Sequence, residues 1–139
     1  MARENVEVVR SWIEAWNRGD YATAVEFVHP EIEVQVAGGF TTDGTYRGLE
    51  GLGTFLQDFW GDFEDRHTAL DQFITSGDDV LYAAHAYGRG RLSGVEVELH
   101  HWQVATVREG KVVRWGLFKT KREAFEAVGL REEGAAHGS

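Results

Sequence analysis

The chain has 139 residues, of which 42% are hydrophobic and 27% are charged, and its formal net charge is −9. This length fits one folded domain, and the acidic balance argues against a nucleic-acid partner, because phosphate binding needs a positive surface. The absence of cysteine excludes disulfides, thiolate metal ligands and cysteine nucleophiles. No apolar run has the length of a signal peptide core or a membrane span, so we expect a cytoplasmic protein without membrane contact.

The first third of the chain predicts two helices and a strand. Apolar residues recur with the helical period from Val6 to Trp16, and Gly19 supplies the backbone freedom that ends this helix. Asp20 is placed to cap a second helix over 21–28, which Pro30 prevents from continuing. Residues 32–36 alternate with period two and predict a strand, and 38–44 predict a loop.

The rest of the chain predicts one more long helix and then strands. A strong apolar stripe predicts a helix over 49–63. Strands are expected over 69–75, 80–91, 95–107 and 112–119, with turns at 76–79 and 108–111, where Gly110 supplies a positive φ. A short helix follows over 122–128. This order is an α+β pattern, and we expect one domain over 1–130 and a flexible tail over 131–139.

Four segments carry a resemblance to a known family. They are Trp16-Asn17-Arg18-Gly19-Asp20, His29-Pro30-Glu31-Ile32-Glu33, Tyr46-Arg47-Gly48 and Glu109-Gly110-Lys111-Val112-Val113-Arg114-Trp115. In this order and spacing the chain resembles the SnoaL-like branch of the NTF2-like family. The resemblance implies an α+β cone, in which three N-terminal helices pack on a curved, mostly antiparallel sheet and enclose one pocket. The family includes polyketide cyclases, ketosteroid isomerases, epoxide hydrolases, dehydratases and members without a demonstrated reaction, so the fold alone does not choose the chemistry.

The ketosteroid isomerases offer a residue-by-residue test of this resemblance. Their oxyanion-binding tyrosine matches Trp12, their general-base aspartate matches Val36, and their protonated acid matches Trp102. Many relatives also carry an acid near the end of the last strand, where this chain has Lys119. The chain is therefore not expected to run the isomerase mechanism with the isomerase residues.

The same matching predicts which strand faces look into the pocket. With Trp102 inward, alternation places His100, Val104 and Thr106 inward, together with His85, Tyr87 and Arg89 on the preceding strand. We therefore expect an aromatic cavity for a small apolar or aromatic molecule, whose substrate-binding residues are Trp12, Trp16, Val36, Phe40, Tyr46, Phe55, Phe59, Trp102, Trp115 and Lys119. The outer face then carries Val97, Leu99, His101, Gln103 and Ala105. The resemblance implies a homodimer on that face, with cover by the terminal segment as the alternative.

Three inward residues are the candidates for catalysis. His85 is the first, as a neutral proton acceptor; His100 would cooperate with it or orient the substrate, and Tyr87 would donate to an oxyanion. The alternative for His85 is a buried histidine satisfied by Tyr87 or by a backbone carbonyl. Glu98 would orient a histidine if no bulge intervenes, and would otherwise be solvated. Arg89 and Lys119 are either donors or rim residues whose charged ends reach water.

Neither a metal nor a cofactor is expected. His85, His100 and Glu98 could imitate a two-histidine, one-carboxylate site, but no helical His-x-x-x-His or Glu-x-x-His spacing occurs. Two functions remain in competition. The first is a cofactor-independent isomerase, cyclase or dehydratase that moves a proton on an apolar carbonyl-bearing substrate through a histidine. The second is a non-catalytic apolar-ligand-binding or dimerisation domain of the same fold.

Overall fold

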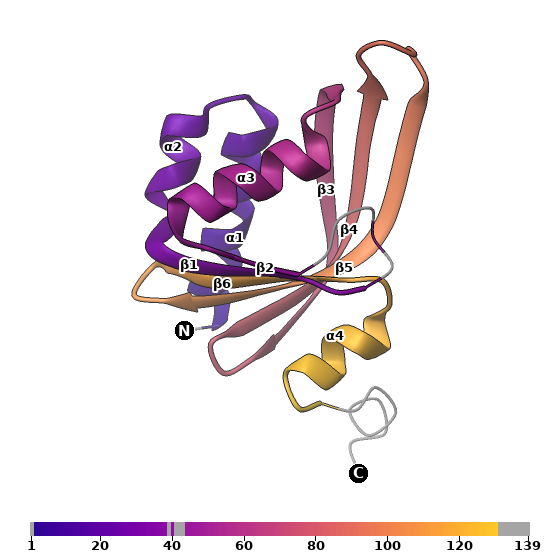
Figure 1. Ribbon diagram of the computed structural model, residues 1–139. Helices are drawn as coiled ribbons and strands as arrows, with labels where there is room; N and C mark the ends of the chain where they lie inside the picture. Colours follow the sequence, from indigo (N-terminus) through magenta and orange to yellow (C-terminus); the bar gives the residue numbers. More distant parts are fainter. Residues whose placement is uncertain (1, 39, 41–43, 131–139) are drawn as a thin grey trace.

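The computed structural model describes residues 2–38, 40 and 44–130. Its helices are α1 (Ala2–Asn17), α2 (Tyr21–Glu26), α3 (Gly48–Trp60) and α4 (Lys121–Ala127). Its strands are β1 (Val28–Val36), β2 (Gly44–Arg47), β3 (Phe63–Ser76), β4 (Asp79–Gly90), β5 (Glu96–Arg108) and β6 (Lys111–Phe118). One curved sheet has the order β2-β1-β6-β5-β4-β3, in which only the β1–β6 pair is parallel. Helices α1, α2 and α3 lie over one face of the sheet, and α4 lies on the other side (Figure 1).

The corner between α1 and α2 forms as the sequence predicts. Gly19 has a φ of 75°, and the amides of Gly19 and Asp20 donate to the carbonyls of Trp16 and Ala15, which closes α1 with a Schellman motif. The Asp20 carboxylate accepts a hydrogen bond from the Thr23 amide at 3.2 Å, and the Thr23 hydrogen bonds lower the pKa of Asp20. The corner thus turns the chain sharply and starts α2 at Tyr21.

The strand registers define two faces of the sheet. On the inner face, which α1, α2 and α3 cover, β4 presents Tyr82, Ala84, Ala86 and Gly88, and β5 presents Leu99, His101, Gln103 and Ala105. The outer face carries the intervening residues of the same strands. His85 pairs with His100 across the β4–β5 ladder, and Ala84 pairs with His101. Because side chains alternate along a strand, these two pairs lie on opposite faces.

Two bulges interrupt the pairing of β3 with β4. The register shifts between Glu64 and His67 and again between Asp71 and Ile74. The residues that absorb these shifts, Asp65 and Gln72, have φ values of 53° and 57°. Each bulge places two residues opposite one and exchanges the faces of the residues beyond it.

Each face of the sheet has its own apolar core. The larger core lies under the helices and includes Trp12, Phe55, Val34 and Trp115. On the outer face, Leu81 and Val104 pack against Ala124 and Phe125 of α4. Thr120 begins α4 with a capping box to Glu123. The terminal helix therefore covers only one end of the outer face.

Several element boundaries differ from the sequence prediction. α1 begins at Ala2, and β1 begins at Val28 and includes Pro30, so α2 is shorter than expected. The structure adds β2, and β3 starts at Phe63, where a helix was predicted. Gly110 and Glu109 both have positive φ, which confirms the tight turn between β5 and β6. The predicted tail, 131–139, lies outside the described residues.

Candidate functional site

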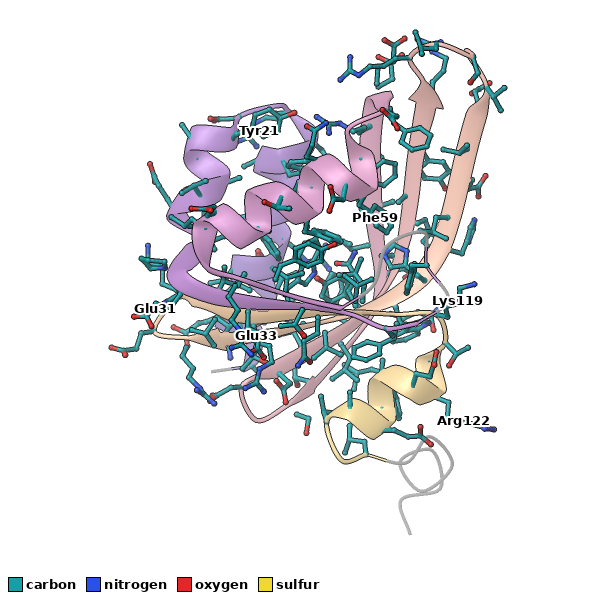
Figure 2. All side chains as sticks on the ribbon, viewed as in Figure 1. Tyr21, Glu31, Glu33, Phe59, Lys119 and Arg122 are labelled. Atoms are coloured by element: carbon teal, nitrogen blue, oxygen red, sulfur yellow. The ribbon has the colours of Figure 1, made fainter. Side chains whose placement is uncertain are left out.

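An apolar cavity of about 300 Å³ lies between the helices and the inner face of the sheet. Helices α1 and α3 contribute Trp12, Trp16, Phe55 and Phe59, and β6 contributes Trp115, as the sequence predicts. Figure 2 shows Phe59 projecting from α3 toward the strands. The remaining lining residues are Ile13, Tyr21, Ala24, Val25, Val28, Leu52, Gly53, Leu56, Gln57, Trp60, Arg66, Thr68, Ala86, His101, Gln103 and Leu117.

Small residues on β4 make room for this cavity. The inner stripe of the strand is Ala84, Ala86 and Gly88, while the helices opposite supply large aromatic rings. A Cβ at Gly88 would lie 3.1 Å from Trp60 and 3.3 Å from Phe63. Glycine therefore lets the Trp60 ring close one end of the cavity directly against the backbone of β4.

Gln103 anchors a buried polar network in the cavity wall. Its Oε1 accepts hydrogen bonds from the Tyr82 hydroxyl at 2.7 Å and from Trp115 Nε1 at 2.9 Å. An indole N–H can only donate, so the amide oxygen must face Trp115. The amide nitrogen of Gln103 then faces His101 Nε2 at 2.9 Å and donates to it. This arrangement makes Nε2 the acceptor and places the proton of the neutral His101 ring on Nδ1.

His101 is buried and its Nδ1 has no hydrogen-bond partner in the described part of the chain. Burial lowers the pKa of this imidazole to about 4, and the outer-face rings of His85 and His100 add to the shift. The Leu99 backbone opposes the shift but makes no hydrogen bond of normal geometry with Nδ1. An unpaired buried donor costs about 1–3 kcal/mol. At neutral pH His101 is therefore an uncharged hydrogen-bond donor.

The other polar side chains of the described lining are Tyr21 of α2, Gln57 of α3, and Arg66 and Thr68 of β3. The Arg66 guanidinium donates to the Tyr21 hydroxyl at 2.9 Å and lies 4.9 Å from the Trp16 ring centroid. The backbone of Thr68 is held by Asn17 at the end of α1. The lining residues that the structure describes include no carboxylate. The described lining residues therefore offer uncharged polar groups and one positive charge.

The predicted orientation of β4 and β5 is wrong. His85, Tyr87 and His100 lie on the outer face, and Trp102 lies there too, packed against Phe125 at a ring distance of 6.4 Å. The matching placed Trp102 inward, whereas its neighbours His101 and Gln103 line the cavity. A register that is displaced by one residue exchanges the faces of a whole strand. The expected placement of His101 and Gln103 at an outer interface is therefore also wrong, while the homodimer itself stays a prediction.

The outer-face histidines do contact each other. His85 Nδ1 lies 2.7 Å from His100 Nδ1, and the Glu98 carboxylate contacts His100 Nε2. Glu98 thus contacts a histidine and is also exposed to solvent, so it combines the two alternatives left by the sequence. All three side chains lie across the sheet from the cavity, so they have no access to a ligand inside it. Arg89 also lies on this face and pairs with Glu64 and Asp65.

The remaining expected binding residues lie outside the cavity lining. Val36 is buried in the main core, and Tyr46 packs against Phe55 at a ring distance of 5.5 Å. Phe40 lies 5.9 Å from the His101 ring and 6.1 Å from the Phe59 ring, so it backs two lining residues. Lys119 is exposed, with its Nζ 6.0 Å from the Phe40 ring.

Sequence reasoning missed His101, Gln103, Arg66 and Thr68 as lining residues. Adjacent histidines at 100 and 101 always place one ring on each face, so the pattern offered two equivalent registers. A signal in favour of the correct register was the small-residue stripe at 84, 86 and 88, which leaves space only on the inner face. Arg66 was not predictable, because its face depends on the bulge at Asp65.

Two features of the described residues bear on other classes of function. Within residues 2–38, 40 and 44–130, no group of three or more His, Asp or Glu side chains is arranged to hold a metal ion. None of the helices in these same ranges has the length and apolar character that crossing a membrane requires.

The family model for the SnoaL-like domain matches residues 9–115, which is most of the chain. The chain belongs to the SnoaL-like family. No curated protein sequence matches it. The SnoaL-like match spans α1 through β6 up to Trp115 and thus covers nearly every element that forms the cavity.

Several solved structures share the fold of this chain. An NTF2-like protein of unknown function from Burkholderia pseudomallei K96243 has 19% identity and a TM-score of 0.72, over 91% of this chain and 98% of that one. A putative SnoaL-like polyketide cyclase from Jannaschia sp. CCS1 has 20% identity and a TM-score of 0.71, over 84% and 85%. TerC, co-crystallised with polyporic acid, has 23% identity and a TM-score of 0.72, over 89% and 96%. At these identities the likeness establishes the α+β NTF2-like fold.

Proposed function

We propose that this SnoaL-like protein binds a flat, apolar, carbonyl-bearing molecule in its cavity and polarises the carbonyl through His101. The observation that carries the proposal is His101, a buried residue of the cavity wall whose Nδ1 has no hydrogen-bond partner among the described residues. The aromatic lining suits a flat molecule, and a cavity of about 300 Å³ lies at the small end of known ligand sites. TerC, a protein of the same fold, was co-crystallised with polyporic acid, which supports a small-molecule ligand here.

The proposed chemistry is cofactor-independent proton transfer of the isomerase, cyclase or dehydratase type. Such reactions pass through an enol or enolate, whose oxygen gains charge as the proton leaves carbon. A neutral imidazole N–H aimed at that oxygen stabilises it without being a strong acid. Gln103 fixes the required tautomer, because its amide donates to Nε2 and leaves the proton on Nδ1.

Binding without turnover is the second candidate. Two observations favour it: the described lining residues include no carboxylate, and burial makes His101 a weak base. A reaction in this cavity would therefore use a substrate group or water as its proton acceptor. Turnover assays over a range of pH on compounds that bind the cavity distinguish the two candidates, since a binding module shows no turnover at any pH.

Two ligands of matched shape test the role of His101. 2-Acetylnaphthalene carries a carbonyl oxygen, and 2-isopropylnaphthalene replaces that oxygen with a methyl group. Quenching of the four cavity tryptophans should show about tenfold tighter binding of the ketone, as expected for one buried hydrogen bond. His101→Phe should remove this preference, and the carbonyl stretch of the bound ketone should shift to lower frequency only in the wild type. Equal affinities would end the role of His101, and no binding of either ligand would end the proposal.

A further inference from the structure

Among the described residues that line the cavity, Arg66 is the one with a cationic side chain. It lies on β3 and reaches the ends of the first two helices, where its Nη2 donates to the Tyr21 hydroxyl at 2.9 Å. Its guanidinium also lies over the Trp16 ring, 4.9 Å from the centroid. These two contacts hold the planar group in place and leave most of its five N–H donors available.

The positive charge of Arg66 has no carboxylate partner in the part of the chain that the structure describes. The neighbouring acids Glu64 and Asp65 both pair with Arg89, on the outer face. This separation follows from the bulge at Asp65. In an uninterrupted strand, Glu64 and Arg66 are two residues apart and would lie on the same face, where they could form an ion pair. The bulge turns Glu64 outward and leaves Arg66 on the cavity side.

An unpaired guanidinium in a mostly apolar wall favours an anionic guest. The protein is rich in acidic residues and carries a net charge of −9. None of these acidic residues is among the described residues that line the cavity. Arginine binds planar oxyanions through two parallel hydrogen bonds, and partial exclusion of water strengthens them. Tyr21 and Trp16 prepare Arg66 for pairing with an oxyanion, because their contacts fix the orientation of its guanidinium group.

Arg66 and His101 lie far apart along the sheet. His101 is opposite Ala84, whereas Arg66 lies beside Gly88, between the paired residues Glu64 and His67. Four residues of strand correspond to about 13 Å. A ligand that engages both groups therefore carries its carbonyl and its acidic group at separate positions.

We propose that the cavity selects molecules that carry a carboxylate, or a similar planar oxyanion, and that Arg66 binds this group. The inference rests on the proposed function, because it assumes an apolar guest in the same cavity. It adds the substrate class: an aromatic or apolar keto acid.

2-Naphthoate and 2-naphthamide test this assignment, because they share shape and differ in charge. Wild-type protein should bind the naphthoate at least tenfold more tightly by tryptophan quenching, and this preference should shrink as NaCl is raised. Arg66→Gln should lose the preference and keep its affinity for the amide. Arg66→Lys, which keeps the charge without the planar fork, should retain part of it. The matched control Arg89→Gln, on the outer face, should behave as wild type.

The outcomes separate this inference from the function on which it rests. Equal binding of the two probes by the wild type, or an unchanged preference in Arg66→Gln with wild-type thermal stability, overturns the role of Arg66 alone. If 2-acetylnaphthalene also fails to bind, the proposed function falls and the inference falls with it.

Discussion

Asn17 and Thr68 exchange two hydrogen bonds across 51 residues of sequence. The Asn17 side-chain nitrogen donates to the Thr68 carbonyl at 2.8 Å, and the Thr68 amide donates to the Asn17 side-chain oxygen at 2.9 Å. Thr68 lies on β3, an edge strand, so these backbone groups have no neighbouring strand on that side. The Asn17 amide takes the place of that strand and fastens the end of α1 beside the cavity.

Replacement of Asn17 should therefore destabilise the protein. We expect Asn17→Ala to lower the free energy of unfolding by about 2–3 kcal/mol in urea titrations, because it leaves a donor and an acceptor of β3 unpaired. Arg18→Ala, at the exposed neighbouring position, is the matched control and should change stability by less than about 0.5 kcal/mol. Equal effects of the two changes would contradict the role of the amide.

The network around Gln103 should also be costly to break. Gln103→Leu leaves the Tyr82 hydroxyl, the Trp115 indole and the His101 Nε2 without their partner, so we expect a loss of about 3 kcal/mol or more. Tyr82→Phe removes a single hydrogen bond and should cost about 1 kcal/mol. Chemical denaturation of both variants measures this difference, and a Gln103→Leu protein as stable as Tyr82→Phe would refute the network.

His101 should make stability depend on pH below neutrality. Its pKa falls from the ordinary 6.5 to about 4 on folding, so the unfolded chain binds a proton more readily in that interval. Stability should therefore be lost as pH falls from 6.5 to 4, by about 3 kcal/mol from this group, and the loss should stop below pH 4. His101→Gln should lack this component while sharing all others. Parallel pH profiles for the two proteins would show that the ring is not buried as a neutral group.

The outer-face histidines should not affect ligand binding. His85→Ala should bind 2-acetylnaphthalene as the wild type does, whereas His101→Ala should bind it about tenfold more weakly. The reason is that the His85 ring lies across the sheet from the cavity and contacts His100 instead. Fluorescence titrations of the two variants, with melting temperatures recorded alongside, measure this contrast. The reverse result would mean that the two faces of β4 and β5 are exchanged.

The sequence was sufficient for the fold because its signals are local and redundant. The Gly19-Asp20 corner, the apolar stripe of α3 and the Gly110 turn each constrain one element, and their order fits one family. Strand β2 was missed because it has only four residues and follows a glycine-rich segment, so it is too short to show an alternating apolar pattern. The predicted end of α3 was wrong because Phe63 continues the apolar stripe of the helix, although this residue begins β3.

The cavity lining was predictable from the helices and, apart from Trp115 of β6, not from the sheet. Trp12, Trp16, Phe55 and Phe59 line it as expected, since a helix with one apolar stripe has only one face to bury. β4 and β5 are apolar on both faces, because α4 covers part of the outer one with Phe125. Alternation then fixes the two sets of side chains but not which set faces inward. The bulges of β3 depend on long-range pairing that no local pattern reports.

The small residues Ala84, Ala86 and Gly88 on the inner face of β4 bear directly on the size of the molecule that the cavity accepts. Ala86 itself contacts the hollow, so each methylene added there consumes space without touching the Gln103 hydrogen bonds or the Arg66 fork. Divergence at this one position can therefore set an upper limit on the bulk of the accepted molecule. Recognition of its functional groups and tolerance of its dimensions are then encoded separately and can evolve independently.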